Sequence, residues 1–135
     1  MQFAQVCDRV ETKRGETDGK GLIGTWINSN LDTNSIACVK ITDANGKLQL
    51  QVLAMGPDGL IDWGSVEAKV FAAGPASHTG AGFAAVFDFG FAETRLQAMI
   101  MKGLLVLAQF HLFKDDSGRA DYFLREYFAM SHDRF

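Results

Sequence analysis

The sequence predicts an all-β fold, a closed up-and-down barrel of eight antiparallel strands joined as a meander. Short segments that alternate apolar and polar residues follow one another from about residue 22 to residue 130. Tight-turn sequences separate these segments, and no long segment has the 3.6-residue period of a helix. Closure into a barrel removes the exposed edges of a flat meander. An open or two-layer antiparallel sandwich is the alternative.

The strands are expected at residues 22–29, 35–43, 47–55, 62–71, 82–91, 93–102, 104–114 and 119–130. Asn45-Gly46 is the strongest hairpin signal between them, because both residues tolerate positive φ. Pro57 suits the fixed φ of a type I turn. Lys102-Gly103 and the DDSG sequence at 115–118 are expected to close the last two hairpins. Residues 72–82 form the one long flexible connection.

Length and composition predict one domain. Residues 1–20 are expected to be an N-terminal extension, as a loop or short helix, and residues 21–135 the single barrel domain. The net charge of −3 argues against nucleic acid as a partner. There is no apolar run long enough for a membrane span and no leader-like N-terminus, so we expect a cytoplasmic protein without a membrane partner. Cys7 and Cys38 are then expected to be reduced thiols, with a disulfide between them as the alternative.

The segment GLIGTWINSN (21–30) shows what the barrel interior contains. On a strand, Leu22, Gly24, Trp26 and Asn28 share one face. An eight-stranded barrel has room inside for side chains or one small ligand, so Trp26 is expected to plug its floor. The glycine two residues earlier allows close backbone packing there.

The Gly24-Thr25-Trp26 sequence resembles the Gly-x-Trp signature in the first strand of the lipocalin and avidin-like barrels, the calycins. The longer GTWIN is similar to the avidin opening, in which an Asn two positions after the Trp lines the ligand cavity. With the later DWG at 62–64, the chain also resembles a little-characterised bacterial group of lipocalin-fold proteins. The resemblance implies a lipocalin- or streptavidin-like barrel with Asn28 in its cavity.

One departure limits what the resemblance implies. Avidin-type biotin sites are aromatic boxes of several tryptophans, whereas this chain has only Trp26 and Trp63, so biotin is not expected. The family also places an Arg near the far end of the last strand, stacked over the Trp. Arg125 is the counterpart that the resemblance suggests, through a cation–π contact.

The last four predicted strands (82–130) are apolar on both faces. One face of residues 104–114 carries Leu104, Val106, Ala108, Phe110 and Leu112, and the other carries Leu105, Leu107 and Phe113. Outward side chains of this kind would expose roughly 600–900 Å², at or above the largest patch of a typical monomer. We therefore expect a homo-oligomer, most simply a homodimer through these strands. The alternative is that the N-terminal 20 residues cover the face.

A mostly apolar pocket with a few convergent polar groups is the usual small-molecule site. The expected ligand-binding residues are Trp26, Asn28, Gln97, Gln109, His111 and Arg125. The sequence thus favours non-enzymatic binding of a small, largely apolar ligand in the barrel. The alternatives are a filled barrel that serves as a structural or interaction module, and an isomerase- or cyclase-type enzyme with Asp88, His111 or Glu126 as a proton shuttle. Each polar residue has the further alternative of facing water or a subunit interface.

Other chemistry finds little support in the sequence. No G-x-S-x-G, Cys–His or P-loop motif is present, and no helix is expected after the glycines at 74, 80 and 82 to receive a phosphate. The three histidines are scattered and form no H-x-H or H-x3-H spacing. We therefore expect neither a metal nor a cofactor, and an enzymatic role is the less favoured interpretation.

Overall fold

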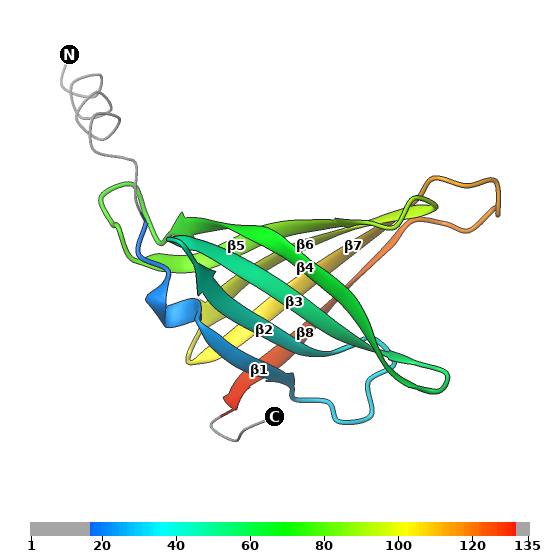
Figure 1. Ribbon diagram of the computed structural model, residues 1–135, viewed down its shortest axis with the longest axis horizontal. Coiled ribbons are helices and arrows are strands. Elements are labelled where there is room, and N and C mark those ends of the chain that lie inside the picture. Colours follow the sequence, from blue (N-terminus) through cyan, green and yellow to red (C-terminus); the bar gives the residue numbers. More distant parts are fainter. Residues whose placement is uncertain (1–16, 132–135) are drawn as a thin grey trace, which may run out of the picture.

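The computed structural model describes residues 17–131, which form a closed antiparallel barrel of eight strands (Figure 1). A short 3-10 turn, η1 (Lys20–Leu22), precedes the first strand. The strands are β1 (Gly24–Asn28), β2 (Ile36–Ala44), β3 (Lys47–Gly56), β4 (Gly59–Ala72), β5 (Gly80–Asp88), β6 (Ala92–Met101), β7 (Leu104–Phe113) and β8 (Tyr122–Ser131). Each strand pairs with the next along the chain, and β1 pairs with β8 to close the barrel.

This architecture confirms the predicted barrel and excludes the sandwich. All eight predicted strands are present, and Asn45 and Lys102 have the positive φ that their tight turns require. Within the predicted extension, residues 1–16 lie outside the described part of the chain. Its last residues are held against the β4–β5 loop, because Asp18 donates its N–H to the His78 carbonyl and accepts from Gly80, both at 2.6 Å.

One end of the barrel, here called the capped end, is closed by η1. The indole Nε1 of Trp26 donates a buried hydrogen bond to the Leu22 carbonyl at 2.9 Å. Gly24, between these residues, has a φ of +145°, and a Cβ there would collide with the Met130 sulfur. The Gly-Thr-Trp sequence therefore has a structural role. The glycine lets the chain turn from η1 into β1, and the tryptophan fixes that turn over the barrel floor, as expected.

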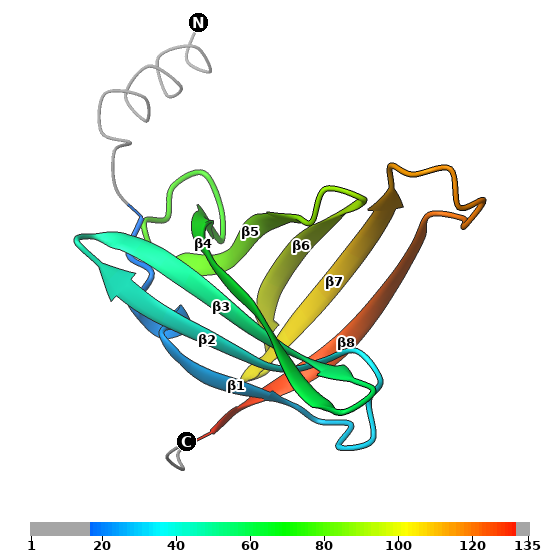
Figure 2. The same ribbon diagram turned by 45° about the vertical axis from the view of Figure 1, so that its right-hand side comes forward.

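The other end, here called the open end, carries the β1–β2 loop (29–35), the β3–β4 turn (57–58), the β5–β6 turn (89–91) and the β7–β8 loop (114–121). β4 and β5 pair only where Lys69–Ala72 meets Gly80–Ala84. Beyond that point the two strands diverge toward the open end (Figure 2). Backbone pairing between β4 and β5 is therefore missing on this side of the open end.

A bulge in β4 brings an aromatic side chain to the diverging strands. Trp63 is the extra residue where the register with β3 shifts, and its neighbour Gly64 has a φ of +91°. Asp62 fixes the bulge by accepting the Gly64 N–H at 2.8 Å. The Trp63 ring then packs edge-on against Phe87 and Phe89, with ring centroids 5.5 and 5.2 Å apart. Aromatic side chains of β4 and β5 thus pack against each other where the two strands no longer share backbone hydrogen bonds.

The side chains of the middle strands alternate as predicted, and those of β5 to β8 are apolar on both faces. Phe83, Leu96, Leu105 and Phe128 are buried inside the barrel. Large apolar side chains also remain exposed on the outside of the same strands.

Cys38 is a buried free thiol whose pKa is raised by burial, and Cys7 lies outside the described residues. Residues 17–131 contain no helix with the length and apolar character that a membrane span requires.

Candidate binding site at the open end of the barrel

The register of β5 to β8 arranges the inward-facing side chains of the open half in layers. The outermost layer joins Phe87, Thr94, His111 and Tyr122, the next joins Ala85, Leu96, Gln109 and Leu124, and the third joins Phe83, Ala98, Leu107 and Glu126. Each layer toward the open end therefore contains a polar group among apolar ones. The capped half, by contrast, is filled by apolar side chains around Trp26.

Four of the polar side chains form a hydrogen-bonded chain. The Thr94 hydroxyl lies 3.0 Å from His111 Nδ1, and His111 Nε2 lies 3.1 Å from Gln109 Oε1. The Ser35 hydroxyl donates to the same amide oxygen at 3.0 Å. Because an amide oxygen only accepts, His111 carries its proton on Nε2 and accepts from Thr94 at Nδ1. The chain therefore fixes the imidazole ring in one orientation and one tautomer.

Two buried polar atoms of this region have no hydrogen-bond partner among the described residues. One is Gln109 Nε2, on a side chain that is 0% exposed, and the other is Glu126 Oε1. The second Glu126 oxygen accepts from the Thr33 hydroxyl at 2.9 Å. In this orientation of the amide, the Gln109 oxygen is engaged by both Ser35 and His111, and Nε2 is the end left without a partner. Gln109 and Glu126 lie in adjacent layers of neighbouring strands, so an unmet donor and an unmet acceptor face the same interior.

Aromatic rings belong to the outermost of these layers, one layer closer to the open end than Gln109. The His111 and Tyr122 rings stack with centroids 4.5 Å apart, and Phe113 packs against Tyr122. On the opposite side lies the aromatic cluster of Trp63 with Phe87 and Phe89 described above. Tyr122 is 51% exposed, so the aromatic rim reaches the surface of the protein.

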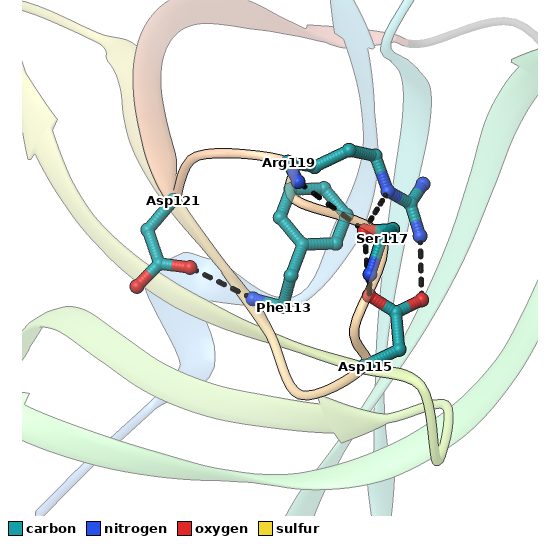
Figure 3. A network of polar contacts seen from close by, with 5 residues as sticks. All are labelled: Phe113, Asp115, Ser117, Arg119 and Asp121. Carbon is teal, nitrogen blue, oxygen red and sulfur yellow. Dashed lines mark hydrogen bonds and ion pairs between the residues drawn. The ribbon is translucent and has the colours of Figure 1, made fainter.

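The β7–β8 loop beside this rim is held by its own polar contacts (Figure 3). Arg119 donates to Asp115 and to the Ser117 hydroxyl, each at 2.9 Å, while its guanidinium lies 4.2 Å from the centroid of the Phe113 ring. Asp121 accepts the Phe113 N–H at 2.9 Å. The Ser117 hydrogen bonds, followed by those of Arg119, lower the pKa of Asp115, so this carboxylate is ionised at neutral pH. The loop is therefore an ordered wall of the open end.

The six residues expected to bind a ligand fall into two groups. Trp26, Asn28, Gln109 and His111 face the interior. Asn28 is fully engaged, since its Nδ2 donates to the Ile36 carbonyl at 2.9 Å and its Oδ1 accepts the Asn30 N–H at 2.8 Å. Trp26 is engaged with Leu22. Of the four, Gln109 alone has an unpaired polar atom.

Gln97 and Arg125 lie on the outer face of the barrel, one residue out of phase with the interior positions. They belong to one row across the sheet, because Gln97 pairs with Ala108 and Ala108 with Arg125. The expected stacking of Arg125 over Trp26 is wrong, since Trp26 is inside and Arg125 outside. The cause is strand alternation, which turns the flanking Leu124 and Glu126 inward.

The alternative in which Asp88 is the proton shuttle of a barrel enzyme is contradicted by its position. Its side chain is 59% exposed and pairs with Lys114 at 2.9 Å. The Gly90 N–H, followed by Lys114, lowers the pKa of Asp88, which makes its carboxylate a weaker base.

Sequence reasoning missed Thr33, Ser35 and Thr94 as members of the polar network. The position of Thr94 could have been predicted, because the hairpin at 102–103 fixes the register that places Thr94 next to His111 on the inner face. Thr33 and Ser35 had none, because they lie in the β1–β2 loop and reach residues of β7 and β8 far along the chain.

Burial lowers the pKa of His111 below its usual value of 6.5. The unfolded chain therefore takes up this proton at a higher pH than the folded barrel does. We expect the contribution of His111 to stability to be complete above about pH 6.5 and to be lost as the pH falls through the folded-state pKa. Urea unfolding of wild type between about pH 5 and 8 measures this slope. His111→Gln should flatten the slope. A slope in His111→Gln equal to that of wild type would contradict the assignment.

A separate hollow of about 1030 Å³ lies outside the capped end. Three acidic residues (Asp18, Asp43 and Glu67) and three lysines (Lys20, Lys47 and Lys69) line it together, so it has no bias toward one charge of ligand. It opens beside Thr17, where the described chain begins. Residues 17–131 hold no group of three or more His, Cys, Asp or Glu side chains placed to bind a metal ion.

Comparison of the chain with protein family models, with curated proteins and with solved structures finds no match. The eight-stranded meander barrel is the architecture that the resemblance to calycins implies. Function must therefore be argued from the open end itself.

Proposed function

We propose that the protein binds a small, largely apolar molecule at the open end of its barrel, without catalysis. The observation that carries the proposal is the pair of unmet polar atoms, Gln109 Nε2 and Glu126 Oε1, inside an aromatic rim. Leaving a buried donor and acceptor unpaired costs stability, on the order of 1–3 kcal/mol for each group. A ligand group that completes both hydrogen bonds recovers that cost on binding.

The chemistry of the two atoms defines the ligand class. Its polar group must accept from an amide N–H and donate to a carboxylate, as a hydroxyl or a carboxamide does. Its body must be flat and apolar to lie among Trp63, Phe87 and Tyr122. An aromatic or fused-ring molecule with one hydroxyl or amide group meets both requirements.

Two simple probes test this proposal. 2-Naphthol has a flat body with a hydroxyl, and 2-methylnaphthalene has the same body without a donor or acceptor. We expect wild type to bind 2-naphthol about tenfold more tightly or better in calorimetric titrations, because the hydroxyl adds two hydrogen bonds to buried partners. Gln109→Leu should remove most of that preference. Gln49→Leu, the same change on the outer face of β3, should keep it, and thermal unfolding verifies that both variants fold.

Equal affinity of wild type for the two probes would overturn the role of the polar pair. Failure of both probes to bind, together with native mass spectra free of any adduct in protein from its own host, would overturn the binding function itself. That result would favour the filled barrel as an interaction module. Some of the structure supports this second candidate, since Trp26, Phe83 and Phe128 occupy the interior of the capped half and its border.

A further inference from the structure

The outer face of β5 to β8 consists of three parallel rows of side chains. The first row runs through Phe71, Gly82, Met99, Val106 and Tyr127, the second through Lys69, Ala84, Gln97, Ala108 and Arg125, and the third through Val86, Arg95, Phe110 and Phe123. The first and third rows carry the large apolar side chains. The middle row has alanines at two of its central positions. We call these three rows together the outer apolar face.

The outer apolar face has a groove along its first and middle rows, and the large side chains of the third row lie beyond it. The groove has a volume of about 580 Å³, and its lining includes Gly82, Ala84 and Ala108 beneath the larger Met99 and Phe71. A Cβ at Gly82 would collide with the Ala98 carbonyl oxygen, so backbone packing keeps this position small. The third-row ridge is reinforced by the stacking of Phe110 on Phe123, with ring centroids 5.8 Å apart. The face therefore has both the protrusion and the hollow that a self-complementary surface requires.

The exposed apolar area has the size of a stable interface. The side chains on or bordering these rows that are between 36% and 69% exposed are Phe71, Val86, Met99, Met101, Leu104, Phe110, Phe123 and Tyr127. Together they present roughly 700 Å², since one aromatic side chain alone has about 150–250 Å². A monomer seldom leaves such a patch uncovered, and a standard interface covers about 800 Å² on each partner.

We propose that this face is the contact surface of a homodimer with two-fold symmetry. In such a dimer the same rows of both copies meet, and the ridge of one copy fills the groove of the other. The middle row also carries a hydrogen-bond donor, Arg125, and an acceptor, the amide oxygen of Gln97. Arg125 makes no hydrogen bond or ion pair within residues 17–131. A two-fold axis near Ala108, which lies between Gln97 and Arg125 in the row, would bring each guanidinium to the Gln97 amide of the other copy and satisfy it within the interface.

Sedimentation velocity of the full chain over a wide range of protein concentration tests the proposal. We expect wild type to sediment as a dimer, and Met99→Asp and Phe123→Asp each to weaken association by about 30-fold or more, as for a central interface residue. Both side chains are at least 51% exposed, so the variants should keep the wild-type circular dichroism and melting temperature. Leu31→Asp is the matched control, because Leu31 is 85% exposed in the β1–β2 loop, outside these rows.

A wild-type protein that is monomeric at every concentration would overturn the proposal, and residues 1–16 would then be the first candidate to cover the face. A dimer that Met99→Asp and Phe123→Asp leave intact would also overturn it, because a different surface would then hold the two copies together. Binding of 2-naphthol at the open end is measured separately, so either proposal stands or fails without the other.

Discussion

Replacing Trp26 by alanine is expected to lower the free energy of unfolding by about 3–5 kcal/mol. Trp26 is 2% exposed at the floor of the barrel, so its removal leaves a large cavity among apolar side chains. It also removes the indole N–H that the Leu22 carbonyl accepts. Both losses act on the capped end, where η1 is fixed to the barrel.

Trp26→Phe separates the two causes. Phenylalanine keeps most of the apolar volume but leaves the Leu22 carbonyl without its partner, which should cost about 1–3 kcal/mol. Urea unfolding followed by far-ultraviolet circular dichroism measures both variants without relying on tryptophan fluorescence. An alanine variant within about 1 kcal/mol of wild type would show that the capped end does not depend on this side chain.

Asn28→Leu is expected to destabilise the barrel by about 2–4 kcal/mol, although leucine is close to asparagine in size and more apolar. Asn28 is 2% exposed, and its amide pairs with the Ile36 carbonyl and the Asn30 N–H. Leucine would leave the buried Ile36 carbonyl unpaired at the start of β2, at about 1–3 kcal/mol, and would also release the Asn30 N–H at the start of the β1–β2 loop.

The control for this prediction lies in the same loop. Asn34 is exposed, so Asn34→Leu should stay within about 0.5 kcal/mol of wild type in the same urea unfolding experiment. If Asn28→Leu were equally neutral while 2-naphthol binding fell, Asn28 would be a ligand-binding residue, as the resemblance to avidins implies. A loss of stability with probe binding retained would make it a loop anchor.

The strands could be predicted because alternation and turn chemistry are local properties of the chain. Leu48, Leu50 and Val52 alternate with polar residues, and Asn45-Gly46 marks the turn before them. In the segment YFLREYF, large apolar residues occupy both faces, so alternation could not show which face turns into the barrel. A shift of one residue exchanges the two faces of a strand, so Arg125 was expected inside.

Most of the candidate site depends on contacts between distant parts of the chain. Gln109 and His111 were recognisable as polar residues within an apolar strand, and the register confirms that they share the inner face. The contacts of Ser35 with Gln109 and of Thr33 with Glu126 follow from barrel closure, which no local pattern describes. The Trp63 bulge was likewise unpredictable, because it appears only as a shift in the pairing of β3 with β4.

The closure of β1 on β8 also determines how the chain folds. Every other strand pairing joins neighbours in sequence, which form as hairpins at a small entropic cost. The β1–β8 pairing instead joins residues from opposite ends of the described chain, such as Asn28 and Phe128, and its register covers only Thr25 to Asn28. We expect the meander to form first and this seam to close last, after the transition state has been passed. Stabilising changes along the seam should therefore slow unfolding more than they speed folding.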